Sequence, residues 1–398
     1  MLVGLLLSAC DDGAADSALD GPALDAAPDS GSDGPPVDAA PSTDAALAAD
    51  ARLDPCRAPP PPDPAFPLAL AAELQAALDA HTRAAGAPGV VVGVALVDGA
   101  TWAGAAGLAD GNTGEPMTPS ARFRVGSVTK TFTAALIMQH VEAGDWTLDD
   151  PIDAYVPGYD FGPEVTLARL LAHTAGVYNY TDDAGFLLRR TMPQSPRDII
   201  DFALQHESGL APGEAYLYSN TGYYLLGLAL EAVEARPFPE IVRDRLLTPF
   251  GVDALWMEQY EPSPSSCDPV TGHVGGGTEV TEGFSMSWAW AAGGLVGPVG
   301  PLCVWARALF AGDVVSPMSR SAMIEPTPQS IAAGEPYGLG VRVTERGGRP
   351  VLGHTGSTMG FRGELFFDPA NGLCVTVETN DFTADPMPVA EAIWAVLR

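Results

Sequence analysis

Strand-like runs stand at both ends of residues 68–398 with a helical stretch between them, and this order constrains the fold more than any other feature. A helix-periodic segment at 68–85 precedes a β-branched run at 89–97, which ends in the turn pair Asp98-Gly99. Further strand-like runs follow only near the C-terminus. The order predicts an α+β fold: one antiparallel sheet flanked by helices, in which N- and C-terminal strands meet, with an inserted all-helical lobe.

Periodicity and turn signals predict the other elements. Helices are expected at residues 127–143, 167–172, 197–205, 222–234, 240–247 and 387–397. Strands are expected at 337–344, 351–354, 363–367 and 373–379, with a hairpin turn at Asn371-Gly372. No strand-like run interrupts the helical middle, so we expect a functional site where the lobe meets the sheet.

The first 67 residues differ from the rest in composition. An apolar run too short to cross a bilayer, which takes ~20 residues, ends at residues 7–10 in Leu-Ser-Ala-Cys and resembles a bacterial lipobox. No Lys or Arg precedes the run, and a chance cysteine in an apolar stub is the alternative. We expect a lipoprotein-type signal segment at 1–9, lipidation of Cys10, a disordered Asp/Ala/Pro-rich linker at 10–67 and a folded domain at 68–398.

Charge limits the partners. The formal net charge is −30, and residues 11–67 hold twelve Asp against two Arg, so attraction to a nucleic acid backbone is excluded. We expect an exported lipoprotein that faces the periplasm or cell exterior and touches the membrane only through its lipid anchor. Oligomeric state stays open.

The cysteines give no metal signature. The chain contains Cys10, Cys56, Cys267, Cys303 and Cys374, with no C-x-x-C spacing and no histidine cluster beside them, so no metal site is predicted. The four other than Cys10 can form two disulfides in three connectivities or remain buried thiols, and the sequence leaves both readings open.

Lys130 is the only lysine of the chain, and it stands three residues after Ser127 at the start of an apolar helical segment. Residues three apart lie on one helix face, which brings the ammonium group within reach of the hydroxyl. Arginine stays protonated, whereas a buried lysine can lose its proton and act as a base. The pair therefore indicates an activated serine nucleophile, with a helix cap and a surface lysine as the alternative.

Three ordered motifs resemble those of the serine β-lactamase and penicillin-binding DD-peptidase superfamily. Ser127 and Lys130 match its S-x-x-K motif. Residues 218–220 (Tyr-Ser-Asn) match the second motif, and residues 354–357 (His-Thr-Gly-Ser) match the third. The forms resemble the class C β-lactamase and D-alanyl-D-alanine carboxypeptidase branch, and no G-x-S-x-G motif of an α/β-hydrolase occurs.

This resemblance implies a β-lactamase/transpeptidase-like fold and a set of roles. Ser127 would form the acyl-enzyme, Lys130 would take its proton and Tyr218 would carry a proton to the leaving group. Asn220 would bind the substrate amide or orient Lys130. The backbone N–H groups of Ser127 and Ser357 would form the oxyanion hole.

The third motif would line the opposite wall of the site. His354, Thr355 and Gly356 are expected beside the substrate, and His354 offers a cation only when protonated. Arg342 is a candidate for binding a substrate carboxylate, with a surface arginine as the alternative. His173 is expected to be structural.

The resemblance implies a cofactor-free, extracytoplasmic serine hydrolase that is D-Ala-D-Ala carboxypeptidase-like. Its partner would be a small peptide, amide or ester, including the peptidoglycan stem peptide. An esterase or class C-like β-lactamase on the same scaffold is one alternative, and a non-catalytic penicillin-binding module is another.

Overall fold

The computed structural model describes residues 63, 65–264, 267–275, 277–280 and 283–398. Cys10, Cys56, the signal segment 1–9 and nearly all of the linker 10–67 lie outside the described residues, so those expectations stay predictions. No helix in the described part of the chain combines the length and apolar character needed to cross a bilayer.

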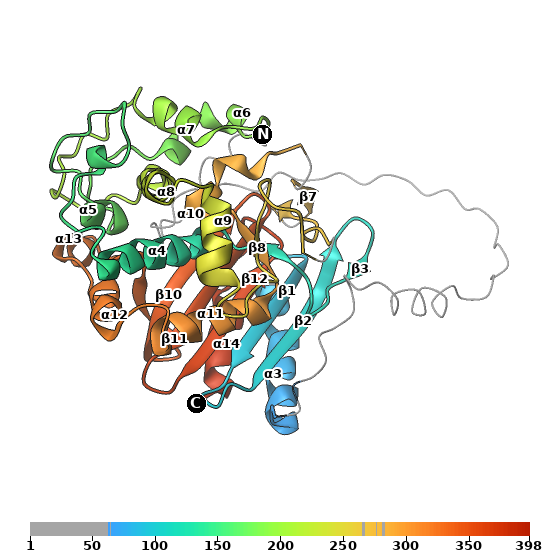
Figure 1. Cartoon of the computed structure of the whole chain (residues 1–398). Coiled ribbons are helices and arrows are strands. Elements are labelled where there is room, and N and C mark those ends of the chain that lie inside the picture. The colour runs from blue at the N-terminus through green and yellow to red at the C-terminus, as the bar shows by residue number, and fades with distance from the viewer. Residues whose placement is uncertain (1–62, 64, 265–266, 276, 281–282) are drawn as a thin grey trace, which may run out of the picture.

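A seven-stranded antiparallel sheet forms the centre of the molecule (Figure 1), in the order β3-β2-β1-β12-β11-β10-β9. The strands are β1 (Gly89–Ala95), β2 (Thr101–Asp110), β3 (Glu115–Pro116), β9 (Arg342–Arg346), β10 (Arg349–Thr358), β11 (Phe361–Asp368) and β12 (Leu373–Thr379). The pairing of β1 with β12 joins the N- and C-terminal parts of the chain, as the sequence predicts.

Helices cover both faces of this sheet. The helices are α3 (Leu68–His81), α4 (Thr129–Ala143), α5 (Leu167–Leu171), α6 (Phe186–Arg189), α7 (Pro196–Ala203), α8 (Asn220–Glu234), α9 (Phe238–Val242), α10 (Trp290–Gly293), α11 (Val299–Ala311), α12 (Pro317–Ile324), α13 (Pro328–Ala332) and α14 (Met387–Val396). α3 and α14 pack on one face, while α11 and the lobe containing α4 to α9 lie on the other (Figure 1). The predicted α+β architecture with an inserted helical lobe is therefore confirmed.

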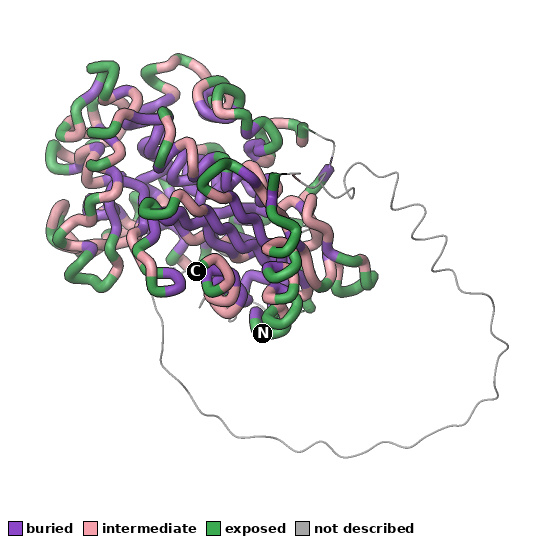
Figure 2. The backbone as a smooth tube through the Cα atoms, turned by 90° about the horizontal axis from the view of Figure 1, so that it is seen from below, coloured by how far each residue is buried: buried purple, intermediate pink, exposed green. Residues whose placement is uncertain are grey.

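Burial explains the all-apolar character of β1. Its alternate residues Val90, Val92 and Val94 contact the core under α3 and α14, and Val91 packs into a separate cluster on the other face. Every residue of β1 is buried. In Figure 2 the buried backbone, drawn in purple, lies in the centre of the molecule. A strand that is covered on both faces has no reason to alternate polar with apolar residues.

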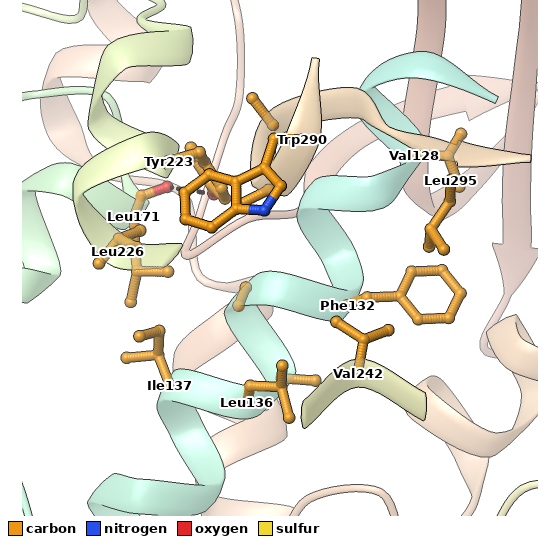
Figure 3. Close-up of a cluster of buried hydrophobic side chains, with 14 of the residues drawn as sticks. Val128, Phe132, Leu136, Ile137, Leu171, Tyr223, Leu226, Val242, Trp290 and Leu295 are labelled. Atoms are coloured by element: carbon orange, nitrogen blue, oxygen red, sulfur yellow. Dashed lines mark hydrogen bonds between the residues drawn. The ribbon is translucent and has the colours of Figure 1, made fainter. Parts of the chain in front are cut away.

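Helix α4 is the axis of the lobe core. Phe132, Leu136 and Ile137 project from it into a cluster with residues of α8, α9 and α10 (Figure 3). Its threonines are also fixed: Thr131 accepts a hydrogen bond from the indole of Trp305 at 2.9 Å. The helix ends at Gly144, whose φ of 80° suits a glycine C-cap. These contacts hold the first turn of α4, which contains Lys130 and directly follows Ser127, in one position.

The expectation that no strand interrupts the helical middle is wrong. A second, three-stranded sheet is built from β4 (Phe123–Arg124), β8 (Leu295–Gly297) and β5 (Trp256–Met257), because strands this short show no readable alternation. The sequence analysis also missed α11, which opens with Gly300 and Pro301 and is stabilised by packing against β1, β11 and β12.

Strand β9 starts later than expected. The run 337–344 was expected as a strand, but β9 begins at Arg342, since Gly340 adopts a φ of 82° and lies against Ala134 of α4. Tyr337 pairs with Arg342 only through an isolated bridge.

The described cysteines include one in a disulfide and two buried free thiols. Cys267 is disulfide-bonded, whereas Cys303 on α11 and Cys374 on β12 are buried free thiols. Burial, and then a hydrogen bond with Cys303, raises the pKa of the Cys374 thiol well above its usual range. Of the two readings left open, two disulfides among the four cysteines are therefore excluded, because Cys303 and Cys374 are free.

Candidate active site

Ser127 lies in the short 3-10 turn Gly126–Val128 that leads into α4, and its exposed fraction is 6%. Gly126 has a φ of 52°, and a Cβ there would come within 2.7 Å of the backbone nitrogen of Ser357. A Cβ on Gly356 would likewise meet the carbonyl oxygen of Val125. These two glycines therefore allow β10 to approach the serine turn closely, which brings the backbone of Ser357 beside Ser127.

Two side chains converge on the oxygen of Ser127. Lys130 Nζ lies 3.0 Å from Ser127 Oγ, and the Tyr218 hydroxyl donates to the same oxygen at 2.8 Å. The lysine comes from the first turn of α4, directly after the 3-10 turn of Ser127. The tyrosine comes from the segment before α8, 91 residues from Ser127 in sequence. The structure thus brings together the three residues that the sequence assigned to catalysis.

Lys130 is fully buried and donates in three directions. Besides Ser127, its ammonium group reaches Asn220 Oδ1 at 2.7 Å and the carbonyl oxygen of Ala292 at 2.8 Å. A neutral amine retains two N–H donors, which suffice for Asn220 and Ala292. The lone pair of the neutral Lys130 nitrogen can then accept the proton of the Ser127 hydroxyl, as a general base requires.

Asn220 is held from its other side. Its amide nitrogen donates to Thr181 Oγ1 at 3.0 Å, and its backbone nitrogen donates to Asn179 Oδ1 at 2.9 Å. These bonds aim the carbonyl oxygen of the side chain at Lys130. Of the two roles considered for Asn220, the geometry fits the orientation of Lys130.

His173 supports the turn that carries Tyr218. It adopts a φ of 56°, is buried, and its Nδ1 accepts a hydrogen bond from the backbone nitrogen of Ser219 at 3.1 Å. Burial, followed by electrostatic repulsion from Lys130 when its amine is protonated, holds the pKa of His173 well below its usual range. A neutral imidazole that accepts a hydrogen bond from the backbone of Ser219 fits a role in positioning the neighbouring Tyr218.

The third motif contributes backbone more than side chains. His354 is fully buried: its ring pairs with the Tyr337 hydroxyl at 2.9 Å, and its pKa is held well below 6.5 by burial and then by Arg342. His354 therefore carries no charge at neutral pH and lies behind the wall of the site. Thr355 is partly buried, and Ser357 lines the pocket beside Ser127.

Arg342 lies next to the catalytic tyrosine but is already paired. Its guanidinium centre is 5.8 Å from the rings of both Tyr218 and Tyr337, and it forms an ion pair with Glu335. A substrate carboxylate at this position would share the guanidinium with Glu335.

A pocket lies beside Ser127, with about 490 Å³ of space free of protein atoms, part of it open to solvent. Its wall includes residues that no motif singled out: Tyr180, Thr181, Arg190, Trp288, Met359 and Phe382. They come from loops and element ends that the fold brings together, so sequence spacing gave no signal for them. Among the described residues, no group of three or more His, Cys, Asp or Glu side chains could hold a metal ion.

Comparisons with known proteins identify the family. The Beta-lactamase family model matches residues 74–397. Penicillin-binding protein 4 of Amycolatopsis lactamdurans is 32% identical over 171 residues, covering 42% of this chain and 43% of that protein. A D-aminopeptidase of Gluconobacter oxydans is 27% identical over 349 residues, covering 82% of this chain and 62% of that protein.

A solved structure is similar over nearly its whole length. The crystal structure of a D-stereospecific amidohydrolase from Streptomyces sp. has a TM-score of 0.70 and 30% sequence identity, covering 81% of this chain and 97% of that one. The chain belongs to the Beta-lactamase family, and it is a serine hydrolase of the β-lactamase fold. It spans about half of the first curated relatives it matches.

Proposed function

We propose that the protein is an acyl-enzyme amidohydrolase that is D-Ala-D-Ala carboxypeptidase-like and cleaves an amide bond next to a D-configured residue. The observation that carries the proposal is the placement of Lys130 Nζ and the Tyr218 hydroxyl on the same oxygen of Ser127. The similarity to a D-aminopeptidase and to a D-stereospecific amidohydrolase supports an amide substrate of D configuration.

Acylation uses both hydrogen-bond partners of the serine. Ser127 Oγ forms a bond to the carbonyl carbon as its proton moves to neutral Lys130. The backbone N–H groups of Ser127 and Ser357 stabilise the negative oxygen that develops. When the C–N bond breaks, Tyr218 gives its proton to the leaving nitrogen.

Deacylation reverses these transfers with water as the nucleophile. The water oxygen bonds to the acyl carbon, and its proton goes to the phenolate of Tyr218. As the ester bond breaks, protonated Lys130 returns the proton to Ser127 Oγ. The enzyme is then restored, and the acyl group leaves as a carboxylic acid.

We also propose that the protein is exported and held to a membrane by lipidated Cys10, which rests on the Leu-Ser-Ala-Cys sequence at residues 7–10. Globomycin treatment of an expressing bacterium should block signal removal and raise the apparent mass. An unchanged mass would overturn the anchor.

A substrate panel tests the activity. The wild-type protein and Ser127→Ala are given diacetyl-L-Lys-D-Ala-D-Ala, the p-nitroanilides of D- and L-alanine, p-nitrophenyl acetate and benzylpenicillin. We expect turnover of a D-configured amide that Ser127→Ala abolishes and that exceeds turnover of the L-enantiomer. Turnover of the ester or of benzylpenicillin alone would favour the esterase or β-lactamase alternative.

A further inference from the structure

Glu378 is a buried carboxylic acid on β12, the central strand of the sheet, and no step of the proposed mechanism uses it. Its exposed fraction is 1%. The preceding residue, Val377, contacts the core under α3 and α14, so the side chain of Glu378 points to the opposite face, where α11 and the helical lobe lie. Among the described residues, Glu378 Oε1 has no hydrogen-bond partner. Such a group is costly to bury, so its presence here needs an explanation.

Two glycines on the neighbouring strands make room for this carboxyl group and for the serine turn. Glu378 pairs with Gly363 of β11, and Gly363 pairs with Gly356 of β10, so the three residues share one face of the sheet. A Cβ on Gly363 would lie 2.1 Å from Glu378 Oε2. A Cβ on Gly356 would lie 2.1 Å from the carbonyl oxygen of Val125. The carboxyl group and the serine turn therefore lie side by side, over strands that are about 4.8 Å apart.

The surroundings of Glu378 keep its carboxyl group protonated. The residues opposite it are Val91 on β1 and Gly363 on β11, and neither carries a charge. Burial raises the pKa of Glu378 well above its usual range, and repulsion from Glu364 raises it further. Charged side chains of the adjoining elements are engaged with other partners: Glu364 with Arg346, Arg124 with Glu258, and Lys130 with Asn220. Glu378 therefore acts on its surroundings through its volume.

We propose that Glu378 is a positioning residue for the oxyanion hole, because its side chain fills the sheet face beside the serine turn and holds β10 in place. The inference rests on the proposed acyl-enzyme function, since an oxyanion forms only in that chemistry. It assigns a role to a residue that contacts neither Ser127 nor the substrate.

The packing explains how this side chain would act on the backbone of β10. Gly363 has no side chain, so removal of the Glu378 carboxyl group would leave a cavity beside Gly356, into which β10 and β11 can relax. The tolerance for such movement is small, because a Cβ on Gly126 would already lie 2.7 Å from the backbone nitrogen of Ser357. A shift of β10 would therefore move the N–H group of Ser357 away from the developing oxyanion.

The first test separates the volume of the side chain from its ability to ionise. Glu378→Gln retains the volume, and Glu378→Ala removes it. On the best substrate of the panel, we expect Glu378→Ala to lower kcat by about tenfold to a hundredfold while KM changes by less than about threefold. Glu378→Gln should stay within about threefold of the wild type in both constants. An unchanged kcat in Glu378→Ala, or equal losses in the two variants, would overturn the inference.

The second test needs neither a substrate nor a folded Glu378→Ala protein. Urea unfolding of the wild type and of Glu378→Gln is compared between pH 5.5 and 7.5. The unfolded chain releases the Glu378 proton above about pH 4.5, whereas the folded protein retains it, so a rise in pH favours unfolding of the wild type. We expect its unfolding constant to rise relative to that of Glu378→Gln by up to about tenfold per pH unit. A constant ratio over this range would overturn the protonated carboxyl group on which the inference depends.

Glu345→Gln is the matched control for the unfolding experiment. Glu345 is an exposed glutamate on β9, and the variant removes the same acid from a position that water reaches in the folded protein. Its unfolding constant should keep a constant ratio to that of the wild type. A ratio that changes as much as that of Glu378→Gln would also overturn the inference, because the effect would then not be specific to the buried carboxyl group.

The outcomes separate this inference from the proposed function. If no substrate acylates Ser127, as judged against Ser127→Ala, the proposed function fails and the inference fails with it. If substrates acylate Ser127 and Glu378→Ala keeps the kcat of the wild type, the acyl-enzyme chemistry stands and only the role of Glu378 is overturned.

Discussion

The two sides of Ser127 are built on different principles. On one side, Lys130, Tyr218 and Asn220 meet through side-chain hydrogen bonds of 2.7–3.0 Å. On the other side, strand β10 contributes backbone, and its His354 is buried and neutral. Side-chain chemistry should therefore decide the function of the first side, and backbone position should decide the function of the second.

The largest effect is expected from Lys130→Met on the hydrogen-bonded side. The change removes the proton acceptor and leaves Asn220 Oδ1 and the Ala292 carbonyl without their donor. We expect kcat/KM to fall by about 10⁴-fold or more. Steady-state kinetics on the best substrate of the panel measures the loss, and circular dichroism checks the fold. A loss below tenfold would mean that Lys130 is not the base.

Tyr218→Phe removes one hydroxyl and retains the ring that packs on His173 at 4.2 Å. In the proposed mechanism the phenol supplies the proton of the leaving group, so we expect kcat to fall by about 10²- to 10⁴-fold on amides. The effect should be smaller on a p-nitrophenyl ester, whose leaving group needs no proton. Equal losses on amide and ester would contradict proton delivery by Tyr218.

Gly356→Ala tests the backbone side without touching any catalytic side chain. The new Cβ would lie 2.1 Å from the Val125 carbonyl oxygen, so β10 has to move away from the serine turn. Loss of one oxyanion donor costs about 10²- to 10³-fold in kcat, and we expect a decrease of this size. Gly300→Ala on α11 is the control, because nothing lies within 4 Å of its added Cβ. If both variants keep full activity, the backbone of β10 is not part of the oxyanion hole.

Ser357→Ala sharpens the comparison from the opposite direction. The proposed role of Ser357 is its backbone N–H, which alanine retains. We expect kcat/KM to change by less than about threefold. A hundredfold decrease would show that the Ser357 hydroxyl takes a direct part in the reaction. Strand β10 would then contribute a side chain as well as its backbone.

The buried imidazole of His354 should make stability depend on pH. Its pKa is lowered in the folded protein from 6.5, first by burial and then by Arg342 and Lys130. The unfolded chain therefore binds the proton first as the pH falls, so the stabilisation present above pH 6.5 is lost below it. We expect urea unfolding of His354→Gln to lose less free energy between pH 7.5 and 5.5 than the wild type. Parallel losses would show that other groups control the acid response.

The hydrogen-bonded side was the more predictable of the two. The i, i+3 spacing of Ser127 and Lys130 fixes their contact within one helix turn, and the motif at 218–220 supplied its partner. The sequence also marked β12 with its correct bounds, because it is a β-branched run that follows an Asn-Gly turn. Such local features can be predicted from sequence because they depend only on residues that are close together along the chain.

The pocket wall and the short strands were not predictable. Arg190, Trp288 and Met359 are far apart in sequence and meet only because the lobe folds back onto the sheet. The charge state of His354 depends on burial and on Arg342, neither of which a motif records. Helix α11 forms despite its Gly and Pro because it packs against the sheet.

The sequence by itself determined the α+β order of the elements and predicted a nucleophile with its base and tyrosine, since these follow from periodicity and motif spacing. Only the tertiary structure decided that the backbone of Ser357 lies beside the serine turn and that Arg190 lies in the wall of the pocket at Ser127. The physical reason is that burial and charge environment depend on residues brought together from distant parts of the chain.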